Sequence, residues 1–220
     1  MGGFLSIDGP LYKILMQVYN LLVLNLLWFF FSIPLFTIGA STTALFYVTR
    51  KIVNDHDYST PVKDFWKSFK QNFLQATVIW LTILFIVLLV YYNIRNIHLF
   101  ETWGRYIVIV YYVILAETMI IGIYIFPILS RYYIKTRDAF KMAFFLGNRY
   151  FITTILCLVV LPAVYFLISW KRYFILIGMS IYSFWIYYLI NRKLRIFETM
   201  NNEAGEQEII EDNTGSGSTI

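Results

Sequence analysis

The sequence contains few charged side chains and few that could carry out chemistry. Of its 220 residues only 14% are charged, one is a cysteine and two are histidines. A soluble domain usually carries about 25% charged residues because its surface faces water, so the composition argues against a water-soluble globular fold. A lone cysteine cannot form an internal disulfide, and no histidine or cysteine cluster has the spacing of metal ligands. We therefore expect no metal site and no cofactor.

The sequence also lacks the motifs of catalysis and of nucleotide binding. It contains no Walker loop, no paired carboxylates, no Gly-x-Ser-x-Gly elbow and no His-Glu-x-x-His helix. We therefore expect no catalytic residues, and we predict that the protein is neither an enzyme nor an ATP-driven motor.

Hydrophobic residues make up 59% of the chain and gather in long runs. A helix needs about 20 mainly apolar residues to cross a membrane, whereas an isolated strand would leave its backbone unpaired in lipid. The sequence therefore predicts an all-α fold, a polytopic transmembrane helical bundle that forms a single domain over residues 1–197. The five predicted spans are residues 14–36, 74–92, 106–126, 151–169 and 173–190.

The few charges are unevenly distributed along the chain. Thirteen of the eighteen basic residues lie between the first and second predicted spans, between the third and fourth, or after the fifth. The positive-inside rule therefore predicts a multi-pass protein of the plasma membrane with its N-terminus outside and its C-terminus in the cytoplasm. Residues 198–220 contain six acidic residues and no base, which predicts an acidic, disordered cytoplasmic tail.

The first predicted cytoplasmic connection contains two helical segments. The first is Ala44–Val53, and the second begins at Thr60-Pro61, a typical N-cap followed by proline. In the second segment, basic and aromatic side chains recur at helical spacing, which predicts an interfacial face for anionic lipid at the inner leaflet or for a membrane-protein partner. Lipid explains these bases well enough that we expect no nucleic-acid partner. The residues of this face are Lys63, Phe65, Trp66, Lys67, Phe69, Lys70 and Phe73.

Two polar residues lie deep within predicted spans. Glu117 is the only charged residue in any span, and both it and Asn25 lie eleven residues from the start of their spans. At helical rise both are about 16 Å deep, so their depth permits a hydrogen bond between them. A charged residue in the membrane either serves a transport path or is held neutral in a hydrogen bond between helices. We favour the structural hydrogen bond and keep the protonatable transport site as the alternative.

The two halves of the chain share an order of features. Each half has a polar mid-span residue, then a proline (Pro34 or Pro127), then a cytoplasmic segment with lysine and phenylalanine. This order predicts a parallel two-helix internal repeat, in which the first two spans correspond to the third and fourth.

Residues 25–52 contain a Pro-x-x-Thr-x-Gly element and an Ala-Leu-Phe-Tyr segment, and residues 65–80 contain a Phe-Lys-x-Asn-Phe segment. Through these motifs the chain resembles the YesL family of bacterial membrane proteins. The resemblance implies a protein of Gram-positive bacteria without an assigned activity, often encoded near carbohydrate-uptake genes. An accessory or regulatory component of a membrane transporter is therefore the expected function, and a small secondary transporter or channel around Glu117 is the alternative. The matching motif residues include Pro34, Thr37, Gly39, Ala44, Leu45, Phe46, Tyr47, Phe69, Lys70, Asn72 and Phe73.

Overall fold

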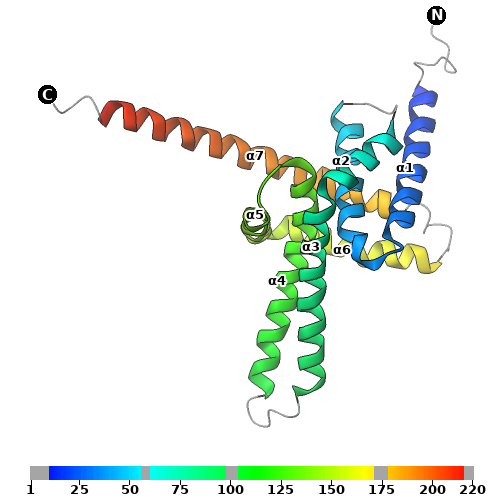
Figure 1. The fold of residues 1–220 in the computed structure, drawn as a ribbon, viewed down its shortest axis with the longest axis horizontal. Coiled ribbons are helices and arrows are strands. Elements are labelled where there is room, and N and C mark those ends of the chain that lie inside the picture. The colour runs from blue at the N-terminus through cyan, green and yellow to red at the C-terminus, as the bar shows by residue number, and fades with distance from the viewer. Residues whose placement is uncertain (1–9, 56–59, 98–103, 171–177, 216–220) are drawn as a thin grey trace, which may run out of the picture.

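A computed structural model describes residues 10–55, 60–97, 104–170 and 178–215. The regular secondary structure of these residues is entirely helical, which confirms the all-α fold class (Figure 1). The helices are α1 (Pro10–Ser32), the short 3-10 helix η1 (Leu35–Thr37), α2 (Ile38–Asp55), α3 (Pro61–Arg95), α4 (Gly104–Arg131), α5 (Thr136–Arg149), α6 (Phe151–Trp170) and α7 (Gly178–Gly215).

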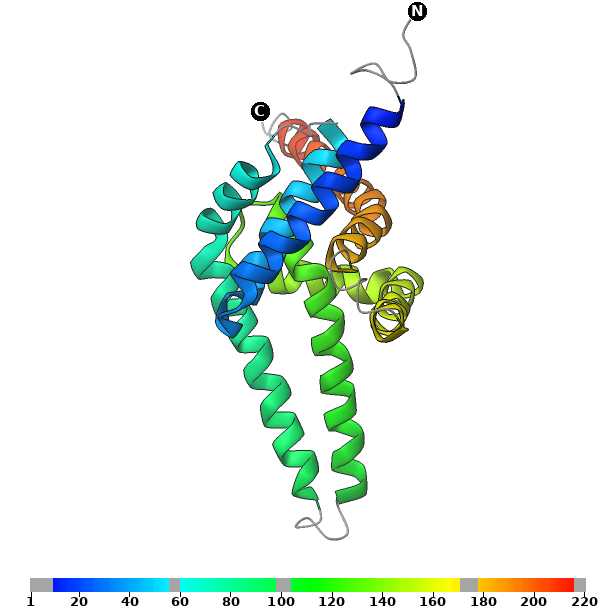
Figure 2. The ribbon, with the colours of Figure 1, turned by 90° about the vertical axis from the view of Figure 1, so that its right-hand side faces the viewer.

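The chain reverses its direction between α1 and α2. Pro34 has an extended backbone (φ −73°, ψ 110°), so α1 ends before it and α2 returns beside α1 (Figure 2). The Trp28 indole N–H donates a hydrogen bond to the Thr42 hydroxyl at 3.1 Å and joins the two helices. The start of α1 therefore lies at the same end of the molecule as the start of α3, whereas the sequence predicts that a membrane separates these two ends.

Helix α2 lies at the centre of the molecule and packs against α1, α3, α4 and α7. Its small and hydroxyl-bearing side chains allow close approach, and the hydroxyls of Ser41 and Thr43 donate to carbonyl oxygens one turn earlier in the chain. The predicted helix at Ala44–Val53 is thus confirmed, but most of its residues belong to the buried core and not to a surface connection.

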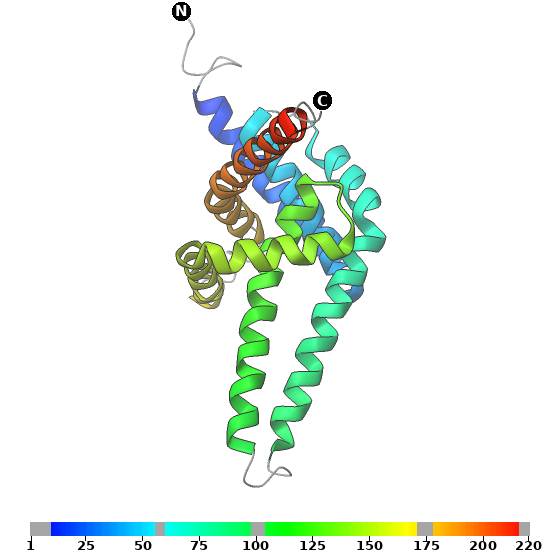
Figure 3. The ribbon, with the colours of Figure 1, turned by 90° about the vertical axis from the view of Figure 1, so that its left-hand side faces the viewer.

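Helix α3 has two halves with different surroundings. Its 35 residues span about 52 Å, more than one membrane crossing requires. Its first half packs antiparallel to α2, whereas residues 81–95 pair with residues 104–117 of α4 in a hairpin that projects from the other helices (Figure 3). Large apolar side chains such as Phe85 and Tyr92 are exposed on this hairpin, as expected of a surface that faces lipid.

Among the described residues, three helical segments are long and apolar enough to cross a membrane. They are Leu15–Ser32, Pro61–Arg95 and Tyr106–Arg131, and they match the first three predicted spans. The fourth predicted span coincides with α6, but α5 and α6 together form a pair bent by 97°. The fifth, residues 173–190, begins in a stretch outside the described residues. Within the described residues, three helices, or four if the bent pair counts as one span, could thus cross a membrane, whereas the sequence predicts five spans over the whole chain.

The apolar helices do not form one set of parallel spans. Helix α1 lies beside the first half of α3, whereas α6 lies to one side of α4 and runs crosswise to it (Figures 1 and 3). The two proposed repeat units also differ, because α3 is continuous where the corresponding α5–α6 segment is bent. Helix α7 continues through Gly215 and projects away from the other helices, whereas the sequence predicts disorder from residue 198.

Candidate functional site

Asn25 is buried where α1 meets the start of α7. Its side-chain oxygen accepts a hydrogen bond from the backbone N–H of Met179 at 3.1 Å. One residue further on, the Ser180 hydroxyl donates to the Leu21 carbonyl oxygen at 2.8 Å. These two hydrogen bonds join the middle of α1 to the start of α7.

Glu117 lies on α4 and is partly exposed. Its carboxylate accepts a hydrogen bond from the side-chain amide of Asn148 on α5 at 3.2 Å. Glu117 thus makes a hydrogen bond between helices, as the favoured structural interpretation expects, but its partner is Asn148 and not Asn25, whose hydrogen bond with Met179 joins α1 to α7. Equal depth in the two spans does not identify the hydrogen-bond partner of either residue, because depth does not specify which way a side chain points around the helix axis.

A second buried polar contact joins α4 to α6. The Tyr124 hydroxyl lies 3.0 Å from the Thr154 hydroxyl, which also donates to the Gly147 carbonyl oxygen at 2.8 Å. The absence of a side chain at Gly147 allows α5 to pack closely on α4, because a Cβ atom there would collide with the Ile120 side chain. In the sequence, a threonine within an apolar run is the signal that points to this contact, and it does not identify the partner.

The predicted basic-aromatic face on α3 divides into a buried and an exposed part. The rings of Phe65 and Phe69 are buried, and their centroids lie 5.6 and 4.9 Å from that of Phe31 on α1. Phe73 is partly buried and packs against Phe69 at 5.4 Å. These phenylalanines belong to the core, which corrects the expectation that all seven residues share a face for lipid or a partner.

The remaining four residues form what we call the α3 basic face. Trp66 is 42% exposed, and its ring stacks on Phe69 at 5.8 Å with only 8° between the ring planes. The Lys70 ammonium lies 4.7 Å from the centroid of the Trp66 ring. A tryptophan fixed by the core therefore lies among three exposed lysines. The members of the α3 basic face are Lys63, Trp66, Lys67 and Lys70.

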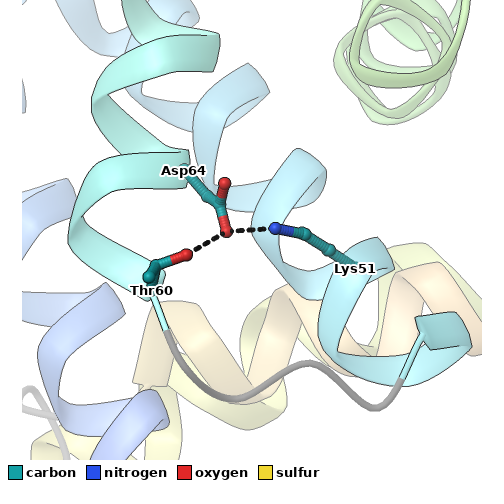
Figure 4. Close-up of polar contacts among 3 residues, drawn as sticks. All are labelled: Lys51, Thr60 and Asp64. Carbon is teal, nitrogen blue, oxygen red and sulfur yellow. Dashed lines mark hydrogen bonds and ion pairs between the residues drawn. The ribbon is translucent and has the colours of Figure 1, made fainter.

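The start of α3 is fixed against α2 by a charged contact (Figure 4). The Lys51 ammonium lies 2.7 Å from the Asp64 carboxylate, which also accepts a hydrogen bond from the Thr60 hydroxyl at 3.1 Å. Thr60 occupies the predicted N-cap position, but its hydroxyl binds this carboxylate and not a backbone N–H. Asp64 in the first turn also interacts favourably with the positive end of the helix dipole.

The four motif residues assigned a structural role also lie around the α2–α3 contact. Pro34 ends α1, and the Thr37 hydroxyl donates to the Pro34 carbonyl oxygen at 2.6 Å. Gly39 meets the backbone of Ala76 closely, and the Asn72 amide donates to the Ser68 carbonyl oxygen at 3.1 Å. All four make local packing or hydrogen-bond contacts.

Within the part of the chain that the structure describes, no three histidine, cysteine, aspartate or glutamate residues come together as metal ligands.

One family model matches the part of the chain that contains the α2–α3 contact. Residues 21–94 match the model of a family described as a protein of unknown function, DUF624. The chain is also similar to the uncharacterized protein YteU of Bacillus subtilis, with 26% identity over 152 residues that cover 66% of this chain and 67% of YteU. No solved structure matches the chain. The matched family segment runs from α1 to the end of α3 and includes the Pro34 reversal and the α3 basic face.

Proposed function

We propose that the protein is a non-enzymatic accessory component of a membrane transporter and that it binds its partner through the α3 basic face. The observation that carries the proposal is that the exposed Trp66 lies among three lysines and that its ring packs on the buried Phe69. The resemblance to the YesL family suggests a transporter of carbohydrates.

The position of this face on α3 favours a contact outside the lipid. The apolar stretch of α3 begins near Leu74, so residues 61–73 extend about 20 Å beyond it at helical rise. We propose that this end of the molecule faces the cytoplasm, because most of the basic residues flank the predicted spans on that side. The start of α1 would then face the cytoplasm as well, in contrast to the outside location expected from the sequence.

The chemistry of the face favours a protein partner with acidic residues. Tryptophan is enriched among the residues that contribute most to protein interfaces, and three lysines complement a negatively charged surface. Trp66 is already held in place by Phe69, so little side-chain entropy is lost when a partner covers it. The expected partner is a cytoplasmic loop or helix of a polytopic membrane protein.

A transport path around Asn25 and Glu117 has less support. The hydrogen bond of Asn25 joins α1 to α7, whereas that of Glu117 joins α4 to α5. A cavity of about 200 Å³ lies farther along α4, between Met119 and Phe126, but apolar side chains dominate its lining.

Quantitative affinity purification from native membranes tests the proposal. The tagged full-length chain would be compared with the triple variant K63E/K67E/K70E and with K135E/R137E/K141E, which makes the same charge change at exposed positions in and next to α5. We expect a polytopic transport protein to be enriched with the wild type, retained with the α5 variant and reduced at least tenfold with the α3 variant. Equal enrichment with both variants would contradict the proposal.

A further inference from the structure

A basic pocket lies where α2, α6 and α7 meet. Its volume is about 370 Å³, and α7 supplies three basic side chains to its wall. Thr153 of α6 and Val53 of α2 complete the opposite side. The polar wall residues contributed by α7 are Tyr187, Tyr188, Asn191, Arg192, Lys193 and Arg195.

Further positive charge reaches this pocket from α2 and α4. The Arg131 guanidinium donates a hydrogen bond to the Asn191 side-chain oxygen at 2.8 Å. Arg50, Arg131 and Arg195 all lie close enough to the Tyr187 hydroxyl to interact with it electrostatically. Basic side chains from three helices that are distant in the sequence therefore converge on one small volume.

An apolar groove adjoins the basic pocket. It has a volume of about 570 Å³, lies between α1, α2 and α7, and is lined by side chains such as Leu21, Phe184 and Trp185. Val53 and Tyr188 line both the groove and the basic pocket, so the two spaces lie on either side of these residues. A positively charged pocket next to an apolar groove complements a molecule with an anionic head and a hydrocarbon chain.

The position of the bases along the chain agrees with a membrane–water interface. Arg131 is the last residue of α4, directly after an apolar stretch that could span a membrane. Arg192 and Lys193 follow the apolar run of α7 in the same way. Basic residues at the ends of apolar helices commonly lie at the level of lipid headgroups.

We infer that this pocket and groove form a binding site for an anionic phospholipid, with the phosphate in the pocket and an acyl chain along the groove. Arginine guanidinium groups can bind phosphate oxygens through two parallel hydrogen bonds, and the groove can cover part of the chain. The site uses α1, α2, α4, α6 and α7 and none of the residues of the α3 basic face, so it does not depend on the proposed partner.

Native mass spectrometry of the full-length protein in neutral detergent tests this site. The ligands would be dioleoyl-phosphatidylglycerol, the zwitterionic dioleoyl-phosphatidylcholine, glycerol 3-phosphate and inorganic phosphate. The variant R192Q/K193Q would be compared with R137Q/K141Q, which removes the same number of charges from exposed positions on α5. Both variants would first be checked for a wild-type elution volume in size-exclusion chromatography.

We expect phosphatidylglycerol to bind at least tenfold more tightly than phosphatidylcholine or either soluble phosphate. Each basic residue near a membrane surface typically strengthens binding of anionic lipid about fivefold, so R192Q/K193Q should weaken it about 25-fold and R137Q/K141Q by less than threefold. Should R192Q/K193Q not elute like the wild type, R195Q alone should weaken binding about fivefold. Equal weakening by the pocket and α5 variants, or equally tight binding of inorganic phosphate, would overturn the inference.

Discussion

The close contact between α2 and α3 makes a strong prediction about Gly39. A Cβ atom at this position would collide with the Ala76 carbonyl oxygen and would lie 2.7 Å from the Trp80 Cβ atom. Neither atom is at the free end of a side chain, so neither can move away by a change of rotamer. The substitution Gly39→Ala should therefore push α2 away from α3 near the reversal at Pro34.

The size of this effect follows from the cost of overpacking. Inserting one methyl group into a well-packed core usually costs about 1–3 kcal/mol, and a rigid backbone neighbour favours the upper part of that range. Separation of the helices would also strain the hydrogen bond from the Trp80 indole N–H to the Leu35 carbonyl oxygen, now 2.8 Å long. We expect Gly39→Ala to lower the free energy of unfolding by about 2–3 kcal/mol.

Gly122 offers a matched control in the same protein. It lies within α4, and a Cβ atom added there would meet nothing within 4 Å. Alanine is better than glycine in a helix interior by about 1 kcal/mol, so Gly122→Ala should leave stability unchanged or raise it. The two glycines carry the same substitution and differ mainly in what the new methyl group meets.

Thermal unfolding in detergent, followed by size-exclusion chromatography after heating, compares the two variants. A change of 1 kcal/mol shifts the melting temperature of a protein of this size by about 2–4 °C. Gly39→Ala should therefore lower the apparent melting temperature by roughly 4–12 °C. If Gly39→Ala melts at the temperature of the wild type or of Gly122→Ala, α2 and α3 do not pack as closely at Gly39 as the structure shows.

Two further predictions concern polar contacts. Glu117→Gln should leave the apparent melting temperature within about 2 °C of wild type, because a glutamine carbonyl can still accept from Asn148, and a larger fall would show that the charge itself stabilises the fold. Asp64→Asn should destabilise the protein by about 1 kcal/mol through loss of the charged contact with Lys51, and this difference should shrink in 1 M salt; a deficit unaffected by salt would point to another cause.

The helices themselves could largely be predicted from the sequence. The apolar runs 74–92 and 106–126 are long enough to specify helices in α3 and α4, and the Thr60-Pro61 pair marks where α3 begins. These features depend on residues near one another in the chain, and local patterns are sufficient for them.

The arrangement of the helices could not be predicted in the same way. The segment around Ser41 and Thr43 is rich in small and hydroxyl-bearing residues, which also occur in loops, yet it forms a helix most of whose described residues are buried. The spacing of Phe65 and Phe69 revealed a common face, but only the position of α1 decides that this face is covered. Depth along a span likewise could not identify the partners of Asn25 and Glu117, because those depend on how each helix is rotated.

Crosslinking tests most directly whether the α3 basic face contacts a membrane-protein partner, as we propose. In living cells, a photo-reactive benzoylphenylalanine placed at Lys67 should form a crosslink to a polytopic transport protein, whereas the same residue at Arg137 on α5 should not. Both positions are exposed basic residues, so they differ in location more than in chemistry. A crosslink to the same protein from both positions, or only to lipid from Lys67, would contradict the claim.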